Sequence, residues 1–155
     1  MKRRQLLSAL LGAATVAVVP TLPALAAPAL PTVEVFKSPY CGCCTAWVDH
    51  IKAAGFAVKV NMVDDTTAVR ERLGMPHVYG SCHTATVDGY ALEGHVPAAE
   101  VRRLLAQRPA AVGLAVPGMP ASSPGMDVPG RNDPYEVLLI DKRGGRRVFA
   151  RYPQS

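Results

Sequence analysis

The sequence lacks the features of several large classes of protein. After its first 26 residues it has no hydrophobic run of the ~20 residues that a membrane-spanning helix needs. Internal repeats and low-complexity tracts are missing, and only 6% of the residues are aromatic. No basic stripe interleaved with aromatic residues is present, so there is no case for nucleic-acid binding. What remains is a chain of 155 residues, 49% of them hydrophobic, which is enough to fold one domain around a real core.

The first 26 residues have the pattern of an export signal. Met1–Arg4 is basic, Leu6–Val19 is apolar, and Ala24–Ala26 offers a small-x-small cleavage site. The alternative is a retained membrane anchor, for which the apolar run is short. We expect residues 1–26 to be cleaved, which takes the formal charge from +5 to +2 by removing three cations, and the mature protein to work outside the cytoplasm. The Arg3-Arg4 pair leaves open whether export uses the twin-arginine route.

The hydrophobic patterns predict an α/β sandwich of thioredoxin-like order over residues 32–112. Their expected order is a strand at 32–37, a helix after Cys44, a strand at 56–62, a short helix at 64–73, a hairpin at 83–93 around Asp88-Gly89, and a helix at 98–107. In the second strand Met62 is expected at or near the core. Residues 113–131 form an irregular Pro/Gly loop, and a second hairpin at 136–150 follows. We expect 113–155 to pack on the same domain, because a hairpin of about twenty residues cannot bury its own core.

Three of the four cysteines crowd into Cys41-Gly42-Cys43-Cys44, between the first strand and the first helix. A C-x-x-C at this junction lies near the free N–H groups of the helix, which favour thiolate. A redox pair needs two sulfurs, whereas a third thiolate is useful to a metal cluster, so Cys43 favours a metal site. Cu(I) and zinc both suit thiolates. The spacing is unlike that of structural zinc sites, and an iron–sulfur cluster would need assembly before export, so copper is the first choice.

Cys82-His83 forms the second group of candidate ligands. In thioredoxin-like folds the segment before the hairpin packs against the cysteine loop, so we expect Cys82 as the fourth ligand and His83 as a ligand or a neighbour. Met119 and Met126 offer thioethers that either bind Cu(I) or pin their loop to the domain. The remaining candidates are given ordinary roles. These are solvation for His50, an N-capping or packing role for His95, and packing around the site for Tyr40 and Trp47.

Five ordered motifs together resemble the DUF411 family. They are Cys41–Cys44 with Trp47, Ser81–Ala85, Glu93–Pro97, Gly113–Pro120 and Ser123–Met126. The resemblance implies a periplasmic thioredoxin-like protein for copper resistance. It would hold copper through Cys41, Cys43, Cys44 and Cys82, as a multinuclear Cu(I) cluster, and meet other periplasmic copper-handling proteins. Interconversion of Cu(I) and Cu(II) stays open, as does any enzymatic turnover.

Two rival interpretations remain open at this point. One is a thiol–disulfide oxidoreductase with Cys41 as nucleophile and Cys44 as resolving thiol. The other is a secreted scaffold with plain Cys41–Cys44 and Cys43–Cys82 disulfides. Only the metal interpretation uses Cys43 as a functional group.

Overall fold

The computed structural model of the protein describes residues 29–153, so the export signal expected at 1–26 lies outside the described residues. The strands are β1 (Val33–Lys37), β2 (Val58–Met62), β3 (His83–Val87), β4 (Tyr90–Glu93), β5 (Gly113–Ala115), β6 (Tyr135–Ile140) and β7 (Arg146–Tyr152). The helices are α1 (Gly42–Ala53), α2 (Thr67–Arg72) and α3 (Ala98–Gln107), with a 3-10 turn, η1, at His77–Tyr79.

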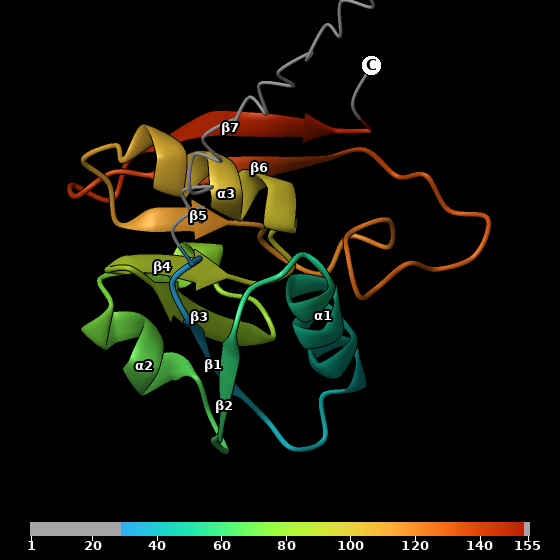
Figure 1. Ribbon diagram of the computed structural model, residues 1–155. Coiled ribbons are helices and arrows are strands. Elements are labelled where there is room, and N and C mark those ends of the chain that lie inside the picture. Colours follow the sequence, from blue (N-terminus) through green and yellow to red (C-terminus); the bar gives the residue numbers. More distant parts are fainter. Residues whose placement is uncertain (1–28, 154–155) are drawn as a thin grey trace, which may run out of the picture.

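The seven strands form one mixed sheet in the order β2-β1-β3-β4-β5-β6-β7 (Figure 1). β1 and β2 are parallel and joined through α1, whereas β3 pairs antiparallel with both β1 and β4. β5 pairs parallel with β4 and antiparallel with β6, and β7 closes the far edge. The chain is therefore a mixed α/β fold, as expected, in which the C-terminal hairpin continues the sheet.

The two faces of the sheet bury separate clusters of side chains, because successive residues of a strand point to opposite faces. α1 and α3 cover one face, where Trp47, Ile51, Val101 and Leu104 are completely buried. The other face lies under α2 and η1 and buries a smaller cluster that includes Met75 and Tyr79. Both α1 and α3 are therefore amphipathic helices, each with one apolar face toward the sheet.

The sequence patterns located the N-terminal elements well and missed one strand. The first strand, the first helix, the hairpin around Asp88-Gly89 and the helix at 98–107 are all present. β5 was missed, since it is three residues long and lies in the segment expected to be irregular. It fits there because Gly113 lacks a Cβ: one added at that position would lie inside the Ala91 carbonyl group of β4.

The expectation that Met62 is at or near the core was wrong. Its side chain is 61% exposed, and Val60 on the same strand is 36% exposed. The physical reason is that β2 is an edge strand of the sheet, where burial depends on how far the covering helix extends. Met75, by contrast, is buried.

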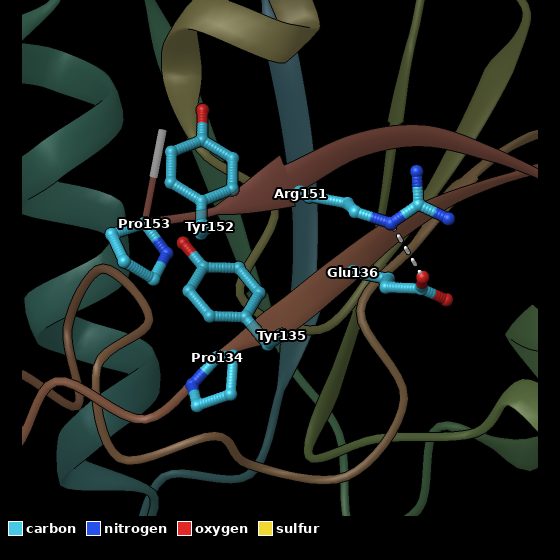
Figure 2. Close-up of a pocket in the computed structure, with 6 residues that line it drawn as sticks. All are labelled: Pro134, Tyr135, Glu136, Arg151, Tyr152 and Pro153. Carbon is cyan, nitrogen blue, oxygen red and sulfur yellow. Dashed lines mark hydrogen bonds and ion pairs between the residues drawn. The ribbon is translucent and has the colours of Figure 1, made fainter. Parts of the chain in front are cut away.

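One surface pocket lies at the end of the β6–β7 hairpin (Figure 2). The rings of Tyr135 and Tyr152 stack there with centroids 4.9 Å apart, and Arg151 Nε donates to Glu136 Oε1 at 3.1 Å. Pro134 and Pro153 complete the lining, so no cysteine or histidine contributes to this pocket. Within residues 29–153, no helix combines the length and the apolar character needed to cross a membrane.

Candidate metal centre

The cysteine turn is positioned by the junction of β1 and α1. Cys41 is the N-cap of α1 in an extended conformation, and its Sγ accepts a hydrogen bond from the Cys44 backbone N–H at 3.3 Å. An N-cap side chain satisfies one of the helix's free N–H groups. The first turn carries no acidic residue. A thiolate at Cys41 would therefore meet the positive end of the helix.

Folding brings the four cysteines together. The sulfur atoms of Cys41, Cys43, Cys44 and Cys82 all lie within 4.8 Å of one another. Cys41 and Cys44 are joined in a disulfide, whereas Cys43 and Cys82 are free thiols. Cys43 Sγ lies 3.5 Å from Cys41 Sγ, and Cys44 Sγ lies 3.6 Å from the Cys82 carbonyl oxygen. The second pairing expected of a plain scaffold, Cys43–Cys82, is not formed.

Two histidines extend the cluster beyond the sulfurs. His95 Nε2 lies 3.1 Å from Cys82 Sγ, and His83 Nδ1 lies 3.4 Å from the same sulfur. Both imidazoles are completely buried. The donor atoms of Cys82, His83 and His95 also lie within 4.8 Å of one another, so Cys82 belongs to two overlapping groups of possible ligands.

A backbone carbonyl group determines which ring nitrogen of His95 carries the proton. His95 Nδ1 lies 2.7 Å from the Pro124 carbonyl oxygen, which only accepts, so Nδ1–H is the donor. The neutral ring then presents an unprotonated Nε2 to Cys82. A carbonyl that fixes the tautomer in this way is the usual arrangement behind a metal-binding histidine.

Burial keeps the two imidazoles in the neutral form that binds metal, but it also keeps the Cys82 thiol protonated, which opposes metal binding. It lowers the pKa of His83 to about 3, with the nearby His95 adding to the effect, and it also lowers the pKa of His95. Burial, with a smaller contribution from neighbouring Cys43, raises the pKa of the Cys82 thiol to about 12. The imidazoles are thus neutral at pH 7 and could bind a metal ion. The Cys82 proton would have to be displaced by a metal ion, as is general for thiol ligands.

The polar atoms of the cluster fit a metal ion. Among the described residues His83 Nε2 has no hydrogen-bond partner although it is buried. A buried nitrogen without a partner is costly, but the His83 nitrogen that lies against Cys82 is Nδ1, so the case for a metal ion rests on the donor set. The donors are thiolates and imidazoles, which suit copper and zinc.

The loop that carries Met119 and Met126 contacts the residues of the cluster through its backbone carbonyl groups. Ser81 Oγ donates to the Gly118 carbonyl oxygen at 2.5 Å, and Pro124 accepts from His95. Gly125, at φ +86, lies so close to α1 that an added Cβ would be 2.6 Å from the Trp47 nitrogen. The thioethers differ in exposure: Met119 is exposed and Met126 is half-buried. Their role as ligands stays a prediction.

Two ordinary roles assigned from the sequence, those of Tyr40 and His50, were wrong. Tyr40 does not pack around the site, because it is 93% exposed on the turn before Cys41. His50 is half-buried rather than solvated: its Nε2 accepts from the Ala98 N–H at the start of α3. Of the two roles expected for His95, it does not cap that helix, but it does pack: it is completely buried, with its ring centroid 5.2 Å from that of His83. Trp47 does pack against the site, with its ring 4.3 Å from that of His83.

His95 is the residue that the sequence analysis undervalued, although a signal for it was present. The turn at Asp88-Gly89 pairs Val87 with Tyr90 and Thr84 with Glu93. Extending that antiparallel register by two residues places His95 opposite Cys82.

Comparisons with known proteins found one family model and two similar solved structures. A family model described as "Protein of unknown function, DUF411" matches residues 79–126. Two solved structures of a copper resistance protein copG, Form 1 and Form 2, are each 44% identical to the chain with a TM-score of 0.76. The alignments cover 81% and 80% of this chain and 99% of the copG chain. A comparison with curated proteins found no match.

Proposed function

The chain belongs to the DUF411 family, as a homologue of copper resistance protein copG, and on that premise we propose that it binds copper in copper resistance. The copper is its cargo, held as Cu(I) on the thiolates of Cys41, Cys43, Cys44 and Cys82. His83 and His95 complete the ligand set, with Met119 and Met126 nearby.

One observation carries this proposal: four sulfurs and two neutral imidazoles converge on one place. The two ligand groups share Cys82, and each spans no more than 4.8 Å. Thiolates and thioethers are soft ligands that select Cu(I), whereas a structural zinc site needs only four ligands in a closed tetrahedron. Six donors around a shared thiolate support several Cu(I) ions bridged by sulfur rather than one zinc ion.

The Cys41–Cys44 disulfide supports a redox side to the same site. If Cu(II) reaches the reduced protein, each of the two thiols gives up one electron and one proton. One S–S bond forms between Cys41 and Cys44, two Cu(II) become two Cu(I), and two protons pass to solvent. Cys43 and Cys82 remain free in this oxidised state. They can therefore retain Cu(I) together with the histidines.

We infer a thioredoxin-like frame for residues 32–112, with 113–155 packed on it as a loop and hairpin. The sheet order β2-β1-β3-β4, with β1 and β2 parallel and the other pairs antiparallel, supports this frame. The periplasm is the inferred compartment, supported by the export pattern of residues 1–26 and by the family's link to copper resistance. Other copper-handling proteins there are the inferred partners.

The disulfide also favours a second candidate function, thiol–disulfide exchange. The bridge links Cys41 at the N-cap with buried Cys44, the arrangement of an exposed nucleophile and a resolving thiol. This alternative has no use for Cys43, Cys82 or the two histidines.

An anaerobic Cu(I) titration of the reduced protein tests the proposal, with Cys43→Ser as the comparison. The thiolate cluster predicts several copper ions per chain and a lower stoichiometry for the variant. An insulin-reduction assay is run on the same samples. Wild-type protein that retains no copper but reduces insulin equally well with and without Cys43 would contradict the copper proposal and support the alternative.

A further inference from the structure

A buried ion pair lies directly behind the candidate metal centre, on the opposite face of the sheet. Arg70 of α2 and Glu93 of β4 have side chains that are 8% and 0% exposed. Arg70 Nε and Nη2 lie 3.0 and 2.9 Å from Glu93 Oε1. Removing two charges from water is costly, so a buried pair is weak support for stability alone.

This pair holds the residue before Cys82 by both of its backbone groups. The Ser81 N–H donates to Glu93 Oε1 at 2.7 Å, and Arg70 Nη2 donates to the Ser81 carbonyl oxygen at 3.2 Å. The arrangement fixes the orientation of the two peptide groups that flank Ser81.

The same carboxylate also holds the residue after His83. Thr84 Oγ1 donates to Glu93 Oε2 at 2.7 Å, so Glu93 is bonded on both sides of Cys82-His83. Thr66 Oγ1 accepts from Arg70 at 2.8 Å and braces the guanidinium from α2. Gly80 leaves room for it, since an added Cβ would be 3.2 Å from Arg70 Cζ.

Cys82 has little else in its own chain segment to hold it. It lies between η1 and β3, before the first residue of the strand. Its side chain has to meet His95 on one side and the Cys41–Cys44 turn on the other. The orientation of the Ser81 peptide therefore bears on where the sulfur lies in both groups.

We propose that Arg70 and Glu93 are positioning residues that hold Cys82 and His83 in the metal centre through Ser81 and Thr84. This inference rests on the proposed function, because it gives the pair a role in copper binding. The pair touches none of the proposed ligands itself and acts only through the two flanking residues. A purely structural pair would affect the fold and leave the position of Cys82 unchanged.

Glu93→Gln tests this role, and Glu100→Gln is the matched control. Glu100 is also a buried glutamate in an ion pair, with Arg103 Nη2 2.6 Å from Oε2, but it lies in α3. Metal-free protein with the Cys41–Cys44 bridge intact is alkylated with iodoacetamide at fixed pH. Mass spectrometry then gives the separate rates of Cys43 and Cys82, and thermal unfolding gives the stability of each variant.

The positioning role predicts a several-fold faster alkylation of Cys82 in Glu93→Gln, with the Cys43 rate unchanged and both rates unchanged in Glu100→Gln. After reduction, Glu93→Gln should bind Cu(I) about tenfold more weakly in a chelator competition, the usual loss on removing an outer-shell partner. If Glu93→Gln does not fold, Arg70→Lys is used, which keeps the charge but loses the two-nitrogen contact with Glu93 that accompanies the Nη2 hydrogen bond to Ser81.

Two results would overturn the inference. One is a Cys82 rate in Glu93→Gln equal to that of wild type. The other is an equal rise in both variants, which would mean that the rate follows stability. Wild-type protein that binds no copper would instead contradict the proposed function, and the Cys82 rates would still decide the positioning role.

Discussion

Acid should destabilise the metal-free protein through His83, and replacing this histidine with leucine should remove part of that effect. His83 is completely buried against Trp47, and burial keeps its pKa at about 3. In the unfolded chain the same side chain titrates near 6.5. Between these values the unfolded state binds a proton that the folded state does not, so stability falls as pH falls.

The size of the effect follows from the unfolded pKa. At pH 5 an ordinary histidine is almost fully protonated, which favours the unfolded state by about 2 kcal/mol compared with pH 7.5. The His83 contribution to stability is therefore fully present above pH 6.5 and is lost as the pH falls toward 3. Because the His83 ring is buried in the folded state, solvent does not weaken this contribution to the free energy of unfolding.

Urea unfolding at pH 7.5 and pH 5.0 measures the difference, with the buried Trp47 as the fluorescent probe, since it is the sole tryptophan of the chain. A chelator keeps the protein metal-free, and no reductant is added. Leucine is close to histidine in volume. His50 and His95 titrate in both proteins, so the comparison cancels their terms. We expect wild type to lose about 2 kcal/mol more than His83→Leu between the two pH values. Equal losses in the two proteins would refute the reasoning.

Three further predictions concern the surroundings of the site. Gly125→Ala should lower the free energy of unfolding by about 1–3 kcal/mol, because at φ +86 an added Cβ would collide with the Trp47 backbone nitrogen. Thermal unfolding measures the loss, and an unchanged Tm would contradict the close approach. Trp47→Phe should lower the free energy of unfolding in urea by about 2–4 kcal/mol, since it removes the 2.8 Å hydrogen bond from Trp47 Nε1 to the Val96 carbonyl oxygen and leaves a cavity. A loss below about 1 kcal/mol would mean that neither the hydrogen bond nor the packing of the larger ring stabilises the fold. Denatured, unreduced metal-free protein should show two thiols by Ellman's reagent, those of Cys43 and Cys82, and four after reduction. The reduced protein should also bind more Cu(I) ions per chain than the oxidised protein. Equal numbers of bound ions would show that Cys41 and Cys44 are not ligands.

The main elements and the meeting of the four cysteines were predictable from the sequence because local signals specify them. The alternating hairpin around Asp88-Gly89 has a fixed register, and the apolar face of α1 starts beside the cysteine turn. Together they return Cys82 to the first three cysteines. The same register would have placed His95 there as well.

What could not be predicted depends on contacts between distant segments. β5 exists because β4 offers it an unpaired edge, and three residues with one glycine give no periodic pattern. Met62 is exposed on an edge strand and Tyr40 on the turn before α1, and neither position is marked by the local pattern of apolar residues. Arg70 and Glu93 are 23 residues apart, and nothing in either neighbourhood indicates that they share Ser81.

X-ray absorption at the copper K-edge of the reduced, Cu(I)-loaded protein tests the central claim most directly, because it reports the atoms bound to the metal. Copper held on the four cysteines predicts a Cu(I) edge, a first shell dominated by sulfur, and copper–copper scattering from ions bridged by thiolates. In Cys82→Ser the sulfur contribution should fall and that of nitrogen or oxygen should rise. A first shell of nitrogen and oxygen alone in the wild-type protein would contradict the account.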